Sequence, residues 1–140
     1  VAYRDYFATD ELMFDVPKTD TRLKNKDEVL ALVFPELSEA TMAISANYLA
    51  DSTVYSDSLS GLDFVVLTDN SGANRVYERK GQEFKTYDGE KSVNDDTNTQ
   101  WTLREDGLYA QSGEVLRRLP AHRAFWFGWY AANPQTRLVH

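Results

Sequence analysis

Few side chains in this sequence could do acid–base chemistry or hold a metal ion. His122 is one of two histidines, and its imidazole could act as a base or as a metal ligand because its charge changes near neutral pH. Asp95 and Asp96 stand beside Thr97 and Thr99. Oxygen atoms of these kinds are ligands for Ca²⁺ or Mg²⁺, although the spacing is not that of an EF-hand loop. The structural interpretations are a surface histidine and a solvated polar loop whose threonines hydrogen-bond to the backbone.

Three arginines form a small basic group in an otherwise acidic chain. Arg117, Arg118 and Arg123 could bind a carboxylate or a phosphate, or they could pair with the many Asp and Glu side chains. Trp101 belongs to a predicted strand and is expected in the core, where the acidic loop could supply a partner for its indole N–H. The candidate ligand-binding residues are therefore Thr97, Thr99, Trp101, Arg118 and Arg123.

Composition argues against several classes of protein. The chain has 140 residues, a net charge of −7, a sequence pI of about 4.8 and no cysteine. Its acidity argues against nucleic acid and anionic membrane surfaces as partners, since both attract clustered Lys and Arg. Without cysteine there is no disulfide, zinc-thiolate site or thiol nucleophile, and no apolar run reaches the length of a membrane span. We therefore expect no cofactor and no resident metal ion.

Short strands separated by turn signals are predicted along most of the chain. Residues 61–69 are the clearest strand, because they are apolar and β-branched after a glycine. Residues 61–87 are expected to form a three-stranded meander, and residues 46–50 one helical turn. Residues 88–99 are expected to form a long polar loop, and residues 1–20 an N-terminal arm or first strand. The predicted strands are 28–34, 40–45, 52–58, 61–69, 73–79, 83–87, 100–104, 108–111, 115–119 and 136–139.

The aromatic segment at 119–138 is expected to contain the helix on which the rest of the fold packs. It holds two of the three tryptophans. Pro120 suits the first turn of a helix, and Asn133 before Pro134 is a stop signal. Such a helix either plugs a sheet as a core element or presents an exposed aromatic platform for a sugar or another flat ligand.

Together these elements predict an α+β fold that is mostly antiparallel β. We expect a meander within a partly open barrel or a sandwich, with one short internal helix and a C-terminal aromatic helix. The chain is expected to form a single domain over residues 1–140, because this length suits one core rather than two.

Several motifs in the last third of the chain follow one another in a specific order: NDDTNTQW, LRRLP, AFWFGWY and NPQTRL. This order resembles the second half of the DUF3179 family of uncharacterised proteins, and the resemblance covers residues 21–139. It implies a β-rich fold and an exported protein, and it adds no reaction type, because a fold alone does not specify function. The matching positions are Thr97, Thr99, Trp101, Leu116, Leu119, Pro120, Phe125, Trp126, Phe127, Trp129, Pro134 and Thr136.

Two elements that many relatives carry differ in this chain. The region after the early helix reads YLADSTVYSD, with no histidine, and the central strand reads FVVLTDNSG, with no cysteine. A metal or redox site built from those elements in relatives could not form here. The acidic position ahead of the threonine motif is Asn94, beside Asp95 and Asp96.

The sequence supports three functional hypotheses. The first is a non-catalytic ligand-binding or accessory domain that holds a small molecule or a protein near Trp101 and the C-terminal helix. It is favoured because no nucleophile–base set is visible. The second is a hydrolase-like or metal-dependent enzyme in which His122 is the base and Asp95 or Asp96 orients it or holds a metal. The third is a structural domain that self-associates through an edge strand.

Overall fold

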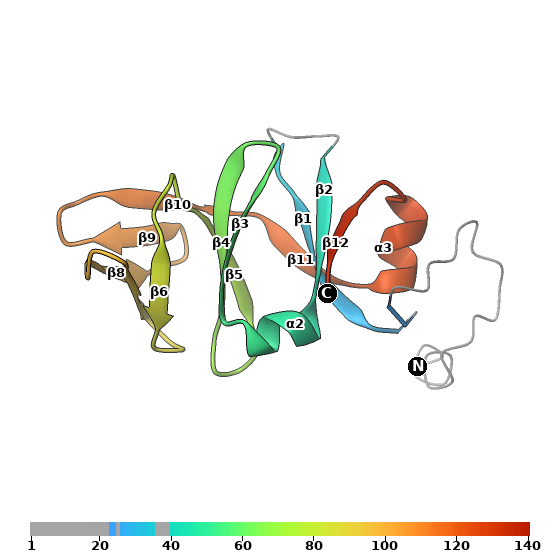
Figure 1. The fold of residues 1–140 in the computed structure, drawn as a ribbon, viewed down its shortest axis with the longest axis horizontal. Coiled ribbons are helices and arrows are strands. Elements are labelled where there is room, and N and C mark those ends of the chain that lie inside the picture. Colours follow the sequence, from blue (N-terminus) through green and yellow to red (C-terminus); the bar gives the residue numbers. More distant parts are fainter. Residues whose placement is uncertain (1–22, 25, 36–39) are drawn as a thin grey trace. The chain divides into compact units, whose positions relative to one another are not determined.

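The structure divides into two compact units. The computed structural model describes residues 23–24, 26–35 and 40–140 (Figure 1). Contacts group Val1–Tyr48 with His122–His140, which we call the terminal unit, and leave Leu49–Ala121 as the central unit. The arm expected at 1–20 lies outside the described residues, and the single domain over 1–140 stays a prediction.

The central unit is an eight-stranded sheet that curls into a nearly closed barrel. Its strands are β3 (Val54–Leu59), β4 (Leu62–Thr68), β5 (Asn74–Glu78), β6 (Phe84–Tyr87), β7 (Ser92–Asp95), β8 (Gln100–Leu103), β9 (Gly107–Ala110) and β10 (Val115–Leu119). Their order is β3-β4-β5-β10-β9-β8-β7-β6, and every pair is antiparallel. The two end strands, β3 and β6, contact each other. The predicted antiparallel, partly open barrel is thus confirmed.

Alternate residues of these strands fill the barrel interior, because successive side chains of a strand point to opposite faces. Val65 of β4 lies opposite Tyr77 of β5, and both are fully buried. Trp101 of β8 is buried as well, and the ring of Phe84 packs against it edge to face at 5.9 Å. The interior cluster is Val65, Leu67, Tyr77, Phe84, Val93, Trp101, Leu108, Ala110 and Leu116.

The three-stranded meander predicted at 61–87 is wrong in its last strand. β4 pairs with β5, but β6 lies at the far end of the sheet beside β7, and the second edge of β5 pairs with β10. The turn after β5 places Lys80 and Gly81 in left-handed conformations, with φ of 47° and 82°. Arg79 donates from Nε to the carbonyl of Phe64 at 3.0 Å. The chain therefore leaves β5 without folding back on it.

The long loop predicted at 88–99 is also wrong, because it contains β7. Val93 is the one apolar residue of this segment, yet it is fully buried and pairs with Tyr87 on one side and Trp101 on the other. Its neighbours Ser92 and Asn94 alternate with it on the other face. Pairing on both sides makes this segment a strand, although no apolar run in the sequence predicts one.

Three hairpins of the barrel share one type of loop. In 69–73, 95–99 and 110–114, the N–H of the first residue donates to the carbonyl of the last at 2.9 to 3.0 Å. The fourth residue of each loop has a left-handed backbone, which is typical of three-residue hairpin loops. These fourth residues are Gly72, Asn98 and Gly113, with φ of 91°, 67° and 94°.

The terminal unit combines a four-stranded sheet with a helix. Its elements are β1 (Glu28–Val33), β2 (Thr41–Ser45), β11 (Ala121–Phe125), α3 (Trp126–Ala132) and β12 (Arg137–Val139). The strand order is β11-β1-β2-β12, in which β12 runs parallel to β2. Helix α2 (Ala46–Asp51) follows β2 directly, which confirms the predicted internal helix.

Helix α3 begins later than predicted. Residues 121–125 continue the sheet as β11 beside β1, so the helix starts at Trp126 and not at Pro120. The N–H of Trp126 donates to the carbonyl of Asp27 at 2.8 Å, which holds the chain on the sheet up to this residue. The helix ends at Ala132 with Asn133 as its C-cap, as predicted.

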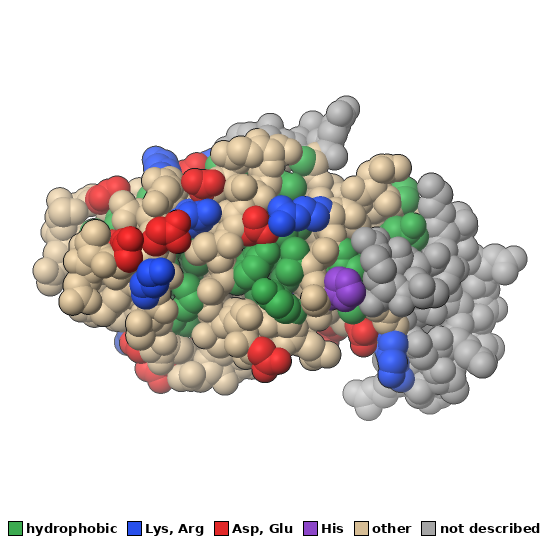
Figure 2. All heavy atoms as spheres, viewed as in Figure 1, with side chains coloured by type: hydrophobic (Ala, Val, Ile, Leu, Met, Phe, Trp, Pro, Cys, Tyr) green, Lys and Arg blue, Asp and Glu red, His purple; other side chains and the backbone are tan. Residues whose placement is uncertain are grey.

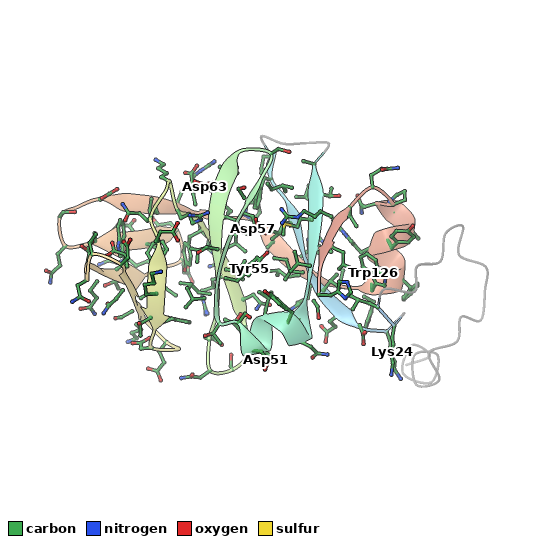
Figure 3. The ribbon with its side chains drawn as sticks, in the orientation of Figure 1. Lys24, Asp51, Tyr55, Asp57, Asp63 and Trp126 are labelled. Carbon is green, nitrogen blue, oxygen red and sulfur yellow. The ribbon has the colours of Figure 1, made fainter. Side chains whose placement is uncertain are left out.

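The two tryptophans of α3 are buried against the sheet of the terminal unit. Figure 3 labels Trp126 at the start of the helix, and both Trp126 and Trp129 pack with Val29, Ala31 and Ala43. This packing favours the core-helix interpretation over the exposed aromatic platform. No helix in the described part of the chain is long and apolar enough to cross a membrane.

Candidate functional site

The acidic loop predicted to bind a ligand is organised around one carboxylate. Asp95 closes β7 and is only 4% exposed. Its Oδ1 accepts from the N–H of Thr97 at 2.9 Å, the hydroxyl of Thr97 at 2.7 Å and the N–H of Thr99 at 2.9 Å. Its Oδ2 accepts from the indole N–H of Trp101 at 3.1 Å. The partner expected for the buried indole is thus the acidic loop itself.

These contacts give Asp95 a structural role. Burial raises the pKa of its carboxyl, but the donors Thr97, Trp101 and Thr99 together outweigh burial and hold that pKa below its usual value. The carboxylate is therefore ionised at neutral pH, with its oxygens bound to the turn. Asp96 is exposed, and its N–H donates to the carbonyl of Glu83 at 2.8 Å. Within the described ranges, no group of three or more His, Asp or Glu side chains could hold a metal ion.

The same arrangement recurs at Asp69, in the loop between β4 and β5. Its Oδ1 accepts from the N–H and hydroxyl of Ser71 at 2.9 and 2.6 Å and from the N–H of Ala73 at 3.0 Å. Its Oδ2 forms an ion pair with Nη1 of Arg75 at 2.7 Å. The Arg75 guanidinium, followed by Ser71, lowers the pKa of Asp69 strongly. The sequence pattern is Asp, then Ser or Thr two residues later, then a side-chain donor six residues later.

A second polar group lies on β3. Figure 3 labels Tyr55 and Asp57, which lie two residues apart on the same face of the strand. The hydroxyl of Tyr55 donates to Oδ2 of Asp57, and Oδ1 of Asp57 accepts from the N–H of Ser58 at 2.7 Å. Both carboxylate oxygens thus have partners within the strand, which indicates a structural pair.

The central unit contains a pocket of about 450 Å³. Its walls come from β5, from the turn between β6 and β7, from the end of β8 and from β10. Tyr77 and Leu103 also line it, and each extends the interior cluster of the barrel. The pocket is therefore one mouth of the barrel, with the buried core beneath it. The charged residues in its lining are Arg75, Lys91, Arg104, Arg118, Glu90 and Glu105.

Strand alternation explains why the basic side chains reach this mouth. Arg75 lies two residues before Tyr77 on the same face of β5, and Arg118 of β10 lies opposite Tyr77 in the register. Lys91 precedes β7, and its carbonyl accepts from the N–H of Leu103 at 2.8 Å. These positions belong to the inward face, just beyond the last buried layer.

Each arginine of the pocket is held by a neighbour. Arg75 pairs with Asp69. The guanidinium of Arg104 lies over the ring of Tyr109, 4.7 Å from its centroid, on the outer face of the sheet that Tyr109 shares with the exposed Thr102. Arg104 contributes its backbone carbonyl to the mouth, where it accepts from Tyr77. Arg118 donates from Nη1 to the carbonyl of Glu105 at 3.4 Å. An arginine has five N–H donors, so one such contact orients the group and leaves other donors for a ligand.

Tyr77 forms the polar part of the pocket floor. Its hydroxyl donates to the carbonyl of Arg104 at 3.3 Å. Burial raises the pKa of Tyr77, and the charges of Arg118 and Arg75 only partly oppose this effect. The phenol is therefore neutral at physiological pH.

The other predicted site residues occupy different places. Arg117 donates from Nε to Glu78 at 3.1 Å, so it faces away from the side chain of Arg118. His122 and Arg123 belong to the terminal unit. The ring of His122 packs edge to face with Trp129 at 5.6 Å, and Arg123 pairs with Glu28 at 3.5 Å. Of the predicted arginines, Arg118 lines the pocket.

The hypothesis that His122 acts with Asp95 or Asp96 joins residues of two units, so it stays a prediction. Arg75, Lys91 and Arg104 were not among the predicted site residues. The one signal for them in the sequence is the pattern that joins Asp69 to Arg75, since register and barrel closure place the others.

A family model described as a protein of unknown function (DUF3179) matches residues 1–136. No curated protein and no solved structure matches the chain.

Proposed function

The chain belongs to the DUF3179 family of proteins of unknown function, and we propose that it is a non-catalytic binding domain for a small anionic molecule. The ligand would sit in the mouth of the central unit. The observation that carries this proposal is the charge of the pocket. Arg75, Lys91 and Arg118 present three basic side chains to the mouth. Against the two carboxylates of the lining they give a formal charge of +1, on a chain whose net charge is −7.

The basic side chains are not cancelled by the acids of the lining. In the described part of the chain, no ion pair joins Glu90 or Glu105 to the pocket cations. Of these cations only Arg75 forms an ion pair, with Asp69, which does not line the pocket. Figure 2 shows acidic and basic side chains interspersed over the central unit on the face in view. A concave site with one predominant sign of charge concentrates ions of the opposite sign. An anion would relieve the repulsion among the clustered cations.

The pocket lacks a serine, threonine or cysteine nucleophile activated by a histidine. Its lining contains no histidine, serine, threonine or cysteine, so it has no nucleophile with an adjacent imidazole base. Asp95, the acid of the enzyme hypothesis, has both oxygens bound to its own turn. The enzyme built on His122 and the self-associating domain both stay predictions.

Isothermal titration calorimetry with phosphate, sulfate, benzoate and succinate tests the proposal. We expect at least one of these anions to bind, with an affinity that falls as salt is added. Arg118→Gln should weaken binding about tenfold, because it removes a charged hydrogen-bond donor worth about 1.5 kcal/mol. Arg117→Gln is the matched control, because Arg117 pairs with Glu78 and does not line the pocket. Absence of binding at millimolar concentration, or an equal loss in both variants, would contradict the proposal.

A further inference from the structure

The three basic side chains that face the pocket stand on two separate walls. Arg75 and Arg118 form the first wall, on the neighbouring strands β5 and β10. Tyr77 joins them, since Arg118 is its register partner and Arg75 lies two residues before it. Diagonal neighbours on one face of a sheet lie about 7–8 Å apart, within reach of long side chains. The two guanidinium groups can therefore bind one anionic group together.

Lys91 forms the second wall, just before β7 and beside the end of β8. The backbone bond from Leu103 N–H to the carbonyl of Lys91 places these two segments side by side. Arg104 follows Leu103 directly, but its guanidinium lies over Tyr109 on the outer face of the sheet and is not part of this wall. The second wall thus presents one cation, the ammonium group of Lys91.

The two walls are separated by β9, by β8 and by the floor of the pocket. Both strands lie between β10 and β7 in the sheet, and strands lie about 4.8 Å apart, so the walls are about 14 Å apart along the sheet. Between them the floor is made by the ring of Tyr77 and the side chain of Leu103. No basic side chain of the lining comes from β9 itself.

From this arrangement we propose that the ligand carries two separated anionic groups on an apolar linker, as an α,ω-dicarboxylate does. One carboxylate binds Arg75 and Arg118, the other binds Lys91, and the linker lies on the floor between. This proposal rests on the anion-binding function proposed above and names its ligand class. The pocket volume of about 450 Å³ falls within the range of sites for organic ligands, and it exceeds the needs of a single inorganic anion.

The test compares ligands with one and with two charged ends. Calorimetry on the full chain would use malonate, succinate, glutarate, adipate and pimelate beside monocarboxylates of the same chain length. We expect an affinity maximum at one chain length, where the dicarboxylate binds at least tenfold more tightly than its monocarboxylate. Shorter diacids fail to reach both walls, and longer ones must bend.

Variants on each wall then separate the two ends. Arg118→Gln and Lys91→Gln should each reduce the affinity for the best dicarboxylate to about that of the matching monocarboxylate. Arg117→Gln and Lys85→Gln are the controls, because both side chains are exposed and neither lines the pocket. Far-ultraviolet circular dichroism of every variant confirms that the sheet is intact.

The outcomes distinguish this proposal from the more general one. If monocarboxylates and dicarboxylates bind equally and Arg118→Gln weakens both, anion binding stands and the two-wall proposal is refuted. The two-wall proposal is equally refuted if Lys91→Gln has no effect on the preferred dicarboxylate. If no anion binds, the proposed function itself fails.

Discussion

Replacement of Asp95 by Asn tests the carboxylate that organises the loop between β7 and β8. The carboxylate accepts on both sides, from Thr97 and Thr99 on Oδ1 and from Trp101 on Oδ2. An amide has one oxygen, so its NH₂ group must face the donors on one side. If that side is the buried indole, the unpaired N–H of Trp101 costs about 1–3 kcal/mol.

The remaining bonds weaken as well, because hydrogen bonds to a charged acceptor are about twice as strong as neutral ones. We therefore expect Asp95→Asn to lower the free energy of unfolding by about 2–4 kcal/mol. Asp96→Asn is the matched control on an exposed neighbour, and it should change this free energy by no more than about 0.5 kcal/mol. Urea unfolding followed by tryptophan fluorescence measures both variants.

The pH dependence of the unfolding free energy provides a second test of the Asp95 carboxylate. The pKa of Asp95 is held below its ordinary value in the fold, so its ionised form stabilises the protein above the unfolded pKa of about 3.9. This stabilisation is lost as the pH falls through the lower folded pKa. The difference between the wild type and Asp95→Asn should accordingly shrink below about pH 4. A structural role for the Asp95 carboxylate is refuted if Asp95→Asn is as stable as Asp96→Asn. It is equally refuted if the wild type and Asp95→Asn differ by the same free energy at pH 7 and pH 3.

Three further substitutions test other contacts. Gly89→Ala should lower the unfolding free energy by more than about 1 kcal/mol, because Gly89 has a φ of 85° and an added Cβ would lie 2.2 Å from Oδ1 of Asn70; thermal unfolding measures the loss. Thr136→Val should lower it by about 1–3 kcal/mol, because it removes the acceptor of the buried Trp129 indole N–H; urea unfolding measures this. Burial raises the pKa of Tyr87 to about 12, so the stability it contributes is complete below the unfolded pKa of about 10 and is lost as the pH rises towards the folded value. Tyr87→Phe should make the alkaline decline in stability shallower in a series of melts across this range.

Matched controls accompany two of these substitutions. Gly113 also has a positive φ, but an added Cβ there meets open space, so Gly113→Ala should lose less stability than Gly89→Ala. Thr102 is exposed on β8, so Thr102→Val should leave the unfolding free energy nearly unchanged. Equal losses within either pair would show that the named contact is not the cause. If stability declines with pH as steeply in Tyr87→Phe as in the wild type, ionisation of the Tyr87 phenol is not the cause of that decline.

Local sequence predicted those parts of the fold in which each segment carries its own pattern. The apolar, β-branched run of β4 was found at nearly its observed bounds, and the buried indole of Trp101 was correctly given a partner in the acidic loop. β7 was missed because Val93 alone marks it. The start of α3 was placed too early, at Pro120. Pairing of β11 with β1 keeps the residues before Trp126 extended.

The pocket was harder to predict, for a geometric reason. Arg118 was proposed as part of a basic group with Arg117, but these neighbours point to opposite faces of β10, and only the register reveals which one enters the barrel. Arg75, Lys91 and Arg104 come from segments that meet only when the sheet is assembled. A search for an Asp followed by Ser or Thr and then a donor at fixed spacing would have located Arg75.

The pairing of β5 with β10 also bears on how the central unit assembles. The sheet consists of two runs of consecutive hairpins, β3 to β5 and β6 to β10, and this pair is the seam between them. Contacts between residues near in sequence form faster than distant ones. The hairpins within each run can therefore form before β5 pairs with β10. Arg75 belongs to the first run and Arg118 to the second. The mouth of the barrel therefore forms only when the two runs pair. A molecule bound to both arginines would stabilise this pairing.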